Sequence, residues 1–189
     1  MTFTGKISKF ILSLFGWKVK GEKPKEKSFV FLAAPHTSNW DFPLGRLTSS
    51  QLNIPLKVLM KKSWFIFPIK KILSWLGAMP IDRSKGGTVI DTIVRIFSEK
   101  DDFVFAITPE GTRSFVKSWK TGFYTIATKA NVPIVCGYLD YKNKVTGVGP
   151  TIYTTGNAQE DFEKIMTFYR TIDACFPERF NQNPTFGRK

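Results

Sequence analysis

The sequence predicts a single α/β domain with a mostly parallel central sheet flanked by helices, preceded by an N-terminal amphipathic helix. The first observation behind this prediction is that short apolar runs alternate with longer amphipathic segments along the chain, which is typical of βαβ units. The second is that three polar motifs directly follow apolar runs, as loops at the carboxyl ends of parallel strands do. The length of 189 residues and the hydrophobic content of 42% suit one domain with a sizeable core.

Residues 1–27 are expected to form a basic amphipathic segment and a linker, ahead of a domain over 28–189. Apolar side chains recur at helical spacing, with lysines and serines between them, at Phe3, Ile7, Phe10, Ile11 and Leu14. This helix is expected to end near Gly16 and to be followed by a lysine-rich linker. Such a helix suits a membrane surface, but its apolar stripe could equally pack on the domain. The two interpretations can both hold for the same helix.

The other elements follow from apolar periodicity and from turn residues. Buried strands are expected at 28–34, 56–60, 78–81, 102–108 and 132–140. Helices are expected at 38–50, 63–77, 88–100, 121–130 and 158–176, with Pro68 kinking or dividing the second of them. A loop is expected at 82–87 and a hairpin-like pair of strands at 141–155.

The charge of the chain indicates an anionic partner. The formal net charge is +13, which suits nucleic acid, an anionic bilayer or a phosphate-bearing substrate. No acidic residue lies between Asp41 and Asp82, and this interval combines six basic residues with Trp and Phe. Lysines beside tryptophans suit anionic lipid head groups. A basic, aromatic surface would also suit single-stranded nucleic acid, so a nucleic-acid-binding module is the competing interpretation from a different class.

The cysteines and the hydropathy limit where the protein is expected to act. Cys136 and Cys175 lie far apart, and with one histidine in the chain no zinc-like ligand spacing occurs. Two free thiols suit a reducing compartment. There is no signal-peptide cleavage pattern and no apolar run of spanning length. We therefore expect a cytoplasmic protein associated peripherally with the inner face of the membrane.

The only histidine, His36, follows an apolar run and precedes Asp41 by five residues. An imidazole can take a proton from a hydroxyl near neutral pH, and a carboxylate on its other nitrogen would fix the tautomer. These residues are therefore a candidate general base and its orienting partner. The structural alternative is that Ser38 and Asp41 form a capping box, in which case Asp41 only satisfies the start of a helix.

Two further motifs follow apolar runs. In the run Pro-Glu-Gly-Thr-Arg-Ser at 109–114, Gly111 allows close backbone approach, Arg113 offers a planar fork for phosphate, and Glu110 could bind a hydroxyl or hold an arginine. The alternative is an ordinary turn with a structural Glu–Arg pair. After the run at 78–81, Arg83 is a second candidate for phosphate, with Asp82 to orient it, although Asp-Arg is a common loop pair.

Several catalytic patterns are missing from the sequence. It contains no G-x-S-x-G elbow, no P-loop and no G-x-G-x-x-G. A covalent acyl-enzyme is therefore not indicated. Direct attack by a substrate hydroxyl that His36 deprotonates is the simpler scheme.

Taken together and in order, these motifs resemble the blocks of the glycerolipid (lysophospholipid, 1-acylglycerol-3-phosphate) acyltransferase family. The first block, His-x4-Asp, is matched by His36 and Asp41, and the second ends in a run matched at Gly77, Ile81, Asp82 and Arg83. The third matches residues 109–114 with Thr108 in place of phenylalanine, and a Lys-x-Gly follows at Lys120 and Gly122. The fourth matches 132–135, with Cys136 in place of its second proline. The resemblance spans roughly residues 28–140.

This resemblance implies an O-acyltransferase that moves a fatty acyl group from a thioester, acyl-CoA or acyl carrier protein, to a hydroxyl of a lysophospholipid. The expected acceptor is 1-acylglycerol-3-phosphate, with another lysophospholipid or a lyso-aminolipid as the alternative. His36 would be the general base and Asp41 its partner. The acceptor would be held by Arg83, Glu110, Gly111, Thr112 and Arg113. The family requires no metal or prosthetic group, and an anionic membrane surface rather than nucleic acid is the expected partner.

Overall fold

A seven-stranded sheet forms the centre of the computed structural model, which describes residues 2–66, 69–81 and 88–187. The strand order is β1-β8-β7-β2-β5-β3-β4, and every neighbouring pair is parallel except β7 with β8. The strands are β1 (Lys18–Lys20), β2 (Phe29–Ala33), β3 (Leu56–Lys61), β4 (Ala78–Ile81), β5 (Val104–Ile107), β7 (Ile134–Asp140) and β8 (Val145–Ile152). The predicted α/β domain with a mostly parallel sheet is confirmed.

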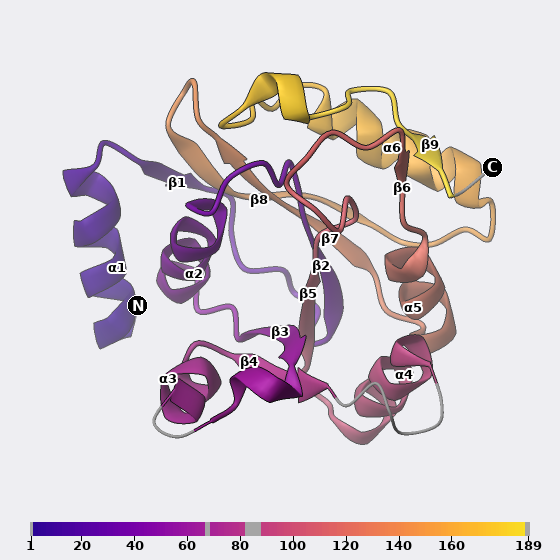
Figure 1. Ribbon diagram of the computed structural model, residues 1–189, viewed down its shortest axis with the longest axis horizontal. Helices are drawn as coiled ribbons and strands as arrows, with labels where there is room; N and C mark the ends of the chain where they lie inside the picture. Colours follow the sequence, from indigo (N-terminus) through magenta and orange to yellow (C-terminus); the bar gives the residue numbers. More distant parts are fainter. Residues whose placement is uncertain (1, 67–68, 82–87, 188–189) are drawn as a thin grey trace.

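Helices cover both faces of this sheet (Figure 1). One face carries α4 (Val89–Glu99), α5 (Gly122–Ala130) and α6 (Ala158–Tyr169), and the other carries α2 (Asp41–Gln51) and α3 (Ile69–Trp75). The N-terminal helix α1 (Phe3–Leu14) packs on the outside of α2. Smaller elements are the 3-10 turns η1 (Lys62–Trp64) and η2 (Pro177–Arg179) and a pair of short strands, β6 (Ser118–Trp119) with β9 (Thr185–Phe186).

The core lies mainly on the α4–α5–α6 side of the sheet. Strand β2 sits in the middle of the sheet and is almost completely buried, because it is apolar on both faces. Its Val30 and Leu32 join the large cluster under α4, α5 and α6, while Phe29 and Phe31 join a smaller cluster on the side of α2. The side covered by α2 therefore has less apolar packing than the other.

Several predicted boundaries of helices and strands are wrong. The helix predicted at 38–50 begins at Asp41, and the helical stretch predicted at 63–77 contains η1 and α3, with 67–68 outside the described residues. The segment 141–155 is not a strand pair, because its one strand, β8, pairs with β7. Part of the expected lysine-rich linker forms the edge strand β1, and the last helix ends at Tyr169. The predicted loop at 82–87 lies outside the described residues.

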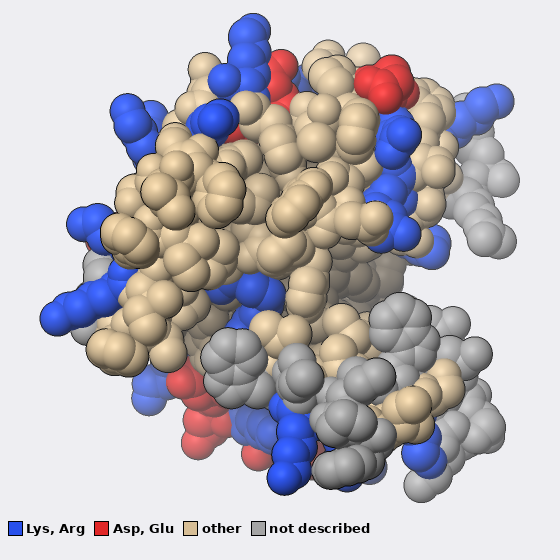
Figure 2. Space-filling view, turned by 60° about the vertical axis from the view of Figure 1, so that its left-hand side comes forward, with Lys and Arg blue, Asp and Glu red and all other residues tan. Residues whose placement is uncertain are grey.

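The apolar stripe of α1 faces away from the domain. The helix buries Gly5, Ser8 and Leu12 against its neighbours. Four of the five side chains of the predicted stripe are instead exposed, namely Phe3, Ile7, Phe10 and Leu14, as is the following Phe15, while Ile11 is half-buried. On this side of the molecule a broad uncharged surface is bordered by Lys and Arg side chains (Figure 2). Of the two interpretations of the helix, packing of the stripe on the domain is therefore wrong.

Candidate active site

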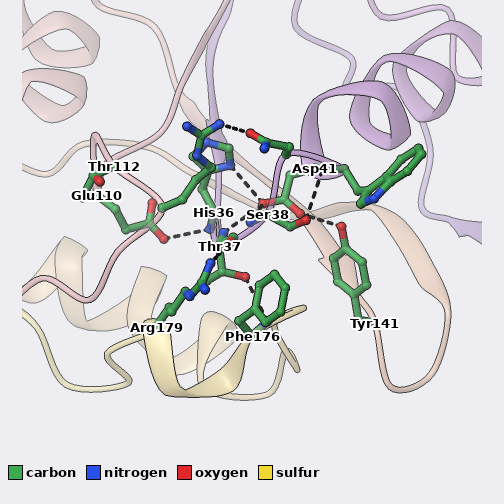
Figure 3. A network of polar contacts seen from close by, with 12 residues as sticks. His36, Thr37, Ser38, Asp41, Glu110, Thr112, Tyr141, Phe176 and Arg179 are labelled. Carbon is green, nitrogen blue, oxygen red and sulfur yellow. Dashed lines mark hydrogen bonds and ion pairs between the residues drawn. The ribbon is translucent and has the colours of Figure 1, made fainter.

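The His36 loop and the loop at 109–114 lie side by side because β2 and β5 are neighbours in the sheet. Leu32 is in register with Ile107, so the two loops leave the carboxyl edge of the sheet together. A hydrogen bond joins them directly: the backbone N–H of His36 donates to Oε1 of Glu110 at 3.0 Å. Figure 3 shows the polar network that results.

The carboxylate of Asp41 organises the loop around His36. Its Oδ2 lies 3.0 Å from Nδ1 of the imidazole and accepts the backbone N–H groups of Thr37 and Ser38, both at 2.9 Å. Its Oδ1 accepts the hydroxyl of Tyr141 at 2.6 Å. The side chain of His36 is 22% exposed and that of Asp41 only 7%, so the imidazole meets solvent on one side and a buried anion on the other.

Both interpretations of Asp41 have a geometric basis. The carboxylate accepts the Ser38 N–H, as the last residue of a capping box would. The Ser38 hydroxyl accepts the N–H of Trp40, which is the residue before α2. The reciprocal half of the box is not formed, because the N-cap of α2 is Trp40 and has no side-chain cap hydrogen bond. The same carboxylate also lies 3.0 Å from the imidazole, so it holds the histidine together with the loop. With Asp41 on Nδ1–H, the lone pair of Nε2 is left for a substrate.

Glu110 is buried, with 5% of its surface exposed. Burial raises the pKa of Glu110 to about 8, the nearby charge of Asp41 adds to this rise, and the hydrogen bonds that its carboxyl accepts oppose it. Its Oε2 is buried without a hydrogen-bond partner among the described residues. The carboxyl therefore holds the backbone of the His36 loop, a contact that the sequence did not predict.

The residues after Glu110 are exposed and carry the positive charge of the site. Gly111 has a φ of +66°, a left-handed backbone conformation that favours glycine, and the side chain of Lys120 lies over it. Thr112 and Arg113 are exposed, and Nη1 of Arg113 donates to Oδ1 of Asn39 next to the histidine loop. The sequence-predicted residue Arg83 lies outside the described residues.

Two residues near His36 were not predicted from the sequence. Tyr141 follows β7 and contacts Asp41, while Arg179 donates to the carbonyl of Thr37 at 3.4 Å and lies 4.3 Å from the centre of the Phe176 ring. Both lie far from the His36 loop in the chain and outside the motifs (Figure 3). A lone tyrosine or arginine in a loop gives no signal by which the sequence could have assigned it to the site.

An apolar cavity of about 750 Å³ opens beside His36. Its charged and polar lining near the histidine comes from Asn39, Asp41, Arg113 and Lys120. From there it extends under α2, where its lining includes Phe31, Leu52, Ile54, Leu56, Val58 and Ala106. Leu56 is in register with Val104, and Val104 with Phe29, so the cavity reaches the amino-terminal end of β2, about 13 Å from Ala33 at 3.3 Å per residue.

The described residues contain neither a metal-binding cluster nor a membrane-spanning helix. No group of three or more His, Cys, Asp or Glu side chains there could hold a metal ion. In the same part of the chain, no helix combines the length and the hydropathy that crossing a bilayer requires. Cys136 is buried in the core, which raises the pKa of its thiol to about 12.

One protein-family model matches most of the residues between α1 and the end of β7. The family model described as "Acyltransferase" matches residues 16–139, which is more than half of the chain. The chain belongs to the acyltransferase family. This match covers the His36 loop, the 109–114 loop and strand β7 up to Leu139, and it ends before Tyr141.

The fold of this acyltransferase is shared with a solved structure. The crystal structure of the 1-acyl-sn-glycerophosphate (LPA) acyltransferase PlsC from Thermotoga maritima is similar with a TM-score of 0.65 and 18% sequence identity. The similarity covers 89% of this acyltransferase and 76% of the Thermotoga chain. No curated protein sequence matches the chain.

Proposed function

We propose that this acyltransferase moves a fatty acyl group from an acyl thioester to a hydroxyl of a lysophospholipid, with 1-acylglycerol-3-phosphate as the acceptor. The observation that carries the proposal is the His36–Asp41 pair, which stands at the polar end of a long apolar cavity. A base next to an apolar cavity suits a reaction between a hydroxyl and a fatty chain. The donor would be acyl-CoA or acyl carrier protein.

In the proposed reaction His36 is the general base. Its Nε2 takes the proton of the acceptor hydroxyl as the oxygen attacks the thioester carbonyl, and Asp41 stabilises the imidazolium that forms. The tetrahedral intermediate collapses with cleavage of the C–S bond. The imidazolium then returns the proton to the leaving sulfur, so that an ester and a thiol are the products. This scheme uses no metal or prosthetic group.

The acceptor phosphate would lie against the basic side chains at the mouth of the cavity. Arg113 and Lys120 both line the cavity close to His36, and guanidinium and ammonium groups are the usual phosphate ligands. We propose that Gly111 and Thr112 complete this loop, and that Arg83, which follows β4 in the sequence, also binds the phosphate. For Glu110 we propose a role in holding the His36 loop, because its carboxyl is buried. The described substrate of the Thermotoga protein, a glycerophosphate that carries one acyl chain, supports this acceptor.

The fatty acyl group would occupy the apolar part of the cavity. At about 750 Å³ it falls within the range of sites for ligands of this size. Its lining on the side of α2 is aliphatic and aromatic. At Gly137 an added Cβ would lie 2.0 Å from the Phe31 ring, so this glycine lets the ring lie across β7 at the cavity wall.

We also propose that the enzyme works on the cytoplasmic, inner face of an anionic membrane. The exposed apolar side chains of α1 and the lysines between them, Lys6 and Lys9, give that helix the composition of an interfacial helix. The basic, aromatic interval between Asp41 and Asp82 was also expected to suit lipid head groups, and two of its residues, 67–68, lie outside the described part of the chain. A net charge of +13 is explained by such a surface without a nucleic-acid partner.

The test is an assay of the purified protein and of His36→Ala with a labelled acyl thioester and a panel of lysolipids. Loss of a general base typically lowers the rate by about 10²–10⁴, so we expect the variant to lose at least a hundredfold in kcat while its melting temperature is kept. Lysophosphatidate is expected to be the best acceptor. A preference for a lyso-aminolipid would change the acceptor and keep the reaction, whereas near-normal turnover of His36→Ala would overturn the mechanism.

A further inference from the structure

Tyr141 contacts the candidate catalytic pair from outside the family match. It directly follows β7, and its hydroxyl donates to Oδ1 of Asp41 at 2.6 Å. Burial raises the pKa of Tyr141, and the hydrogen bond to the Asp41 carboxylate raises it further. The phenol therefore keeps its proton and remains a donor throughout the neutral pH range.

The two oxygens of Asp41 have unequal support. Oδ2 is shared by the imidazole and by two backbone N–H groups. For Oδ1, the Tyr141 hydroxyl is the one donor found among the described residues. Removing that hydroxyl would leave one oxygen of a buried carboxylate without a partner, and the carboxylate could then turn about its Cβ–Cγ bond. The orientation of the imidazole depends on the carboxylate, so this turning would reach His36.

The ring of Tyr141 is in turn held by the N-terminal segment. Trp17, which follows α1, meets it edge-on with 5.1 Å between the ring centres and 87° between the planes. Trp17 is 8% exposed and packs in one cluster with Leu12 of α1 and Leu139 of β7. Edge-to-face aromatic pairs of this kind contribute to stability beyond the area they bury. A chain of contacts thus runs from α1 through Trp17 and Tyr141 to Asp41.

We propose that Tyr141 is a positioning residue for the His36–Asp41 pair, and that Trp17 positions Tyr141. The inference rests on the proposed role of His36 as general base. It goes beyond that role because it assigns a function in the chemical step to a tyrosine outside the motifs and to the N-terminal segment. On this view the segment from α1 to Trp17 serves the reaction even when no membrane is present.

The test uses Tyr141→Phe with a short-chain thioester and a short-chain acceptor that are both soluble in water. A hydrogen bond to a charged group corresponds to about a tenfold or larger change in rate. We expect kcat to fall by about that factor, with both KM values within twofold, because the tyrosine contacts no substrate in the scheme. Trp17→Leu is expected to lower kcat by a smaller factor with the same soluble substrates.

The matched control is Tyr124→Phe. The hydroxyl of Tyr124 donates to Oδ2 of Asp161 at 2.9 Å, so this substitution removes the same kind of bond from a buried aspartate that lies outside the site. A loss of stability without a loss of kcat is expected for it. If Tyr141→Phe behaves in the same way, its role is structural and the proposal is overturned.

A double-mutant cycle with Asp41→Ala separates direct from indirect action. If Tyr141 acts through Asp41, Tyr141→Phe should lower kcat by less than twofold in the Asp41→Ala background. An equal loss in both backgrounds would overturn the inference. The same experiment includes His36→Ala: an active His36→Ala enzyme would overturn the proposed function, whereas an inactive one beside a normal Tyr141→Phe enzyme would overturn this inference alone.

Discussion

Glu110 carries a carboxyl group in a position where its charge is poorly solvated. The group is buried, its Oε1 holds the His36 backbone, and its pKa is raised to about 8 mainly by burial. In the unfolded chain the same carboxyl titrates at its ordinary value near 4.5. Between these two values the folded protein keeps a proton that the unfolded chain has lost. Folding stability must therefore fall as the pH rises through this window.

Glu110→Gln should remove this part of the pH dependence, because an amide stays neutral and can still accept the His36 N–H. Near pH 5 both proteins carry a neutral group, so their melting temperatures should be similar. At pH 8.5 the glutamine variant should be more stable by on the order of a few kcal/mol, which corresponds to several degrees for a domain of this size. Calorimetry from pH 5 to pH 8.5 measures the difference.

The control for this measurement is Glu99→Gln, which changes an exposed carboxyl on α4. Its melting temperature should follow that of the wild type at every pH. A constant offset between Glu110→Gln and the wild type over the whole range would show that Glu110 is ionised in the folded protein already at pH 5.

The two members of the candidate catalytic pair were predictable from the sequence, but their hydrogen-bond partners were not. His36 and Asp41 stand five residues apart after an apolar run, so local spacing indicates their contact. Tyr141 lies 100 residues from Asp41, and its contact arises because β7 neighbours β2 in the sheet. No local sequence pattern predicts a hydrogen bond between residues that lie so far apart in the chain. The expected acceptor-binding role of Glu110 stays a prediction, whereas its burial and its contact with the His36 backbone could not be read from its residue type.

At the scale of elements, α1 reverses the usual rule for a helix on a domain surface. Such helices bury their apolar stripe, whereas α1 buries two small residues and Leu12 and exposes four large apolar side chains. Because the small residues let α1 lie close to α2, the helix is held firmly while its stripe stays outside. Exposed apolar side chains that cluster on one helix indicate a surface that binds a membrane or another apolar partner.

The double variant Phe10→Ser/Leu14→Ser is expected to weaken binding to anionic vesicles. These side chains are 68% and 70% exposed, so the change should leave the fold intact. Burying such a side chain in lipid is worth about 1.5–3 kcal/mol, so a tenfold or larger loss of partitioning is expected. Co-sedimentation at low and high salt measures it: salt should weaken the lysine contribution and leave the apolar part unchanged.

Tyr153→Ser is the matched control for the vesicle experiment. Tyr153 is 62% exposed and lies after β8, outside α1. Its variant should bind vesicles as the wild type does. Wild-type protein that stays in the supernatant with anionic vesicles at low salt would show that the stripe serves some other contact.

The sequence predicts long periodic elements better than short ones at the edge of the sheet. Helix α4 was predicted within two residues, since its stripe is regular and a capping box of Thr88 and Asp91 marks its start. β1 was missed because it has three residues, two of them exposed lysines, and is defined by pairing with β8. The hairpin of β7 and β8 was misplaced because β8, with its two glycines and one proline, has no clear alternation of apolar and polar residues.

At the scale of the whole molecule, the two faces of the sheet do different work. The side of α4, α5 and α6 holds the main core, and the side of α2 holds the cavity. α2 is suited to this because the residues it buries are polar, namely Asp41, Thr48 and Ser49. A helix without a continuous apolar stripe does not fill the space over the sheet, and the apolar residues of β2, β3 and β5 are left to line it.

Ala106→Leu should change which acyl chains the enzyme accepts. Ala106 is in register with Phe31 in the middle of the sheet and lines the cavity under α2. The larger side chain would overlap a long acyl chain, at a steric cost of about 1–3 kcal/mol. The value of kcat/KM for a palmitoyl thioester should therefore fall roughly tenfold or more. A butanoyl thioester serves as the internal control, because its chain is shorter than the roughly 7 Å of strand between Ala33 and Phe31, the level of Ala106. Equal losses for both donors would place the acyl chain outside this cavity.

During synthesis, α1 can reach its final packing only after strands that lie much later in the chain have been made. Lys18 is in register with Val145, and Trp17 packs with Leu139 and Tyr141. The helix is therefore synthesised before β7 and β8 and lacks part of its packing partners until both of these strands have been made. Until then Leu12 and Trp17, which the finished fold buries, and the unpaired edge of β1 stay exposed. Tyr141, the hydrogen-bond partner of Asp41, lies between β7 and β8. The packing of α1 and the hydrogen bond to Asp41 are therefore completed in the same step of folding.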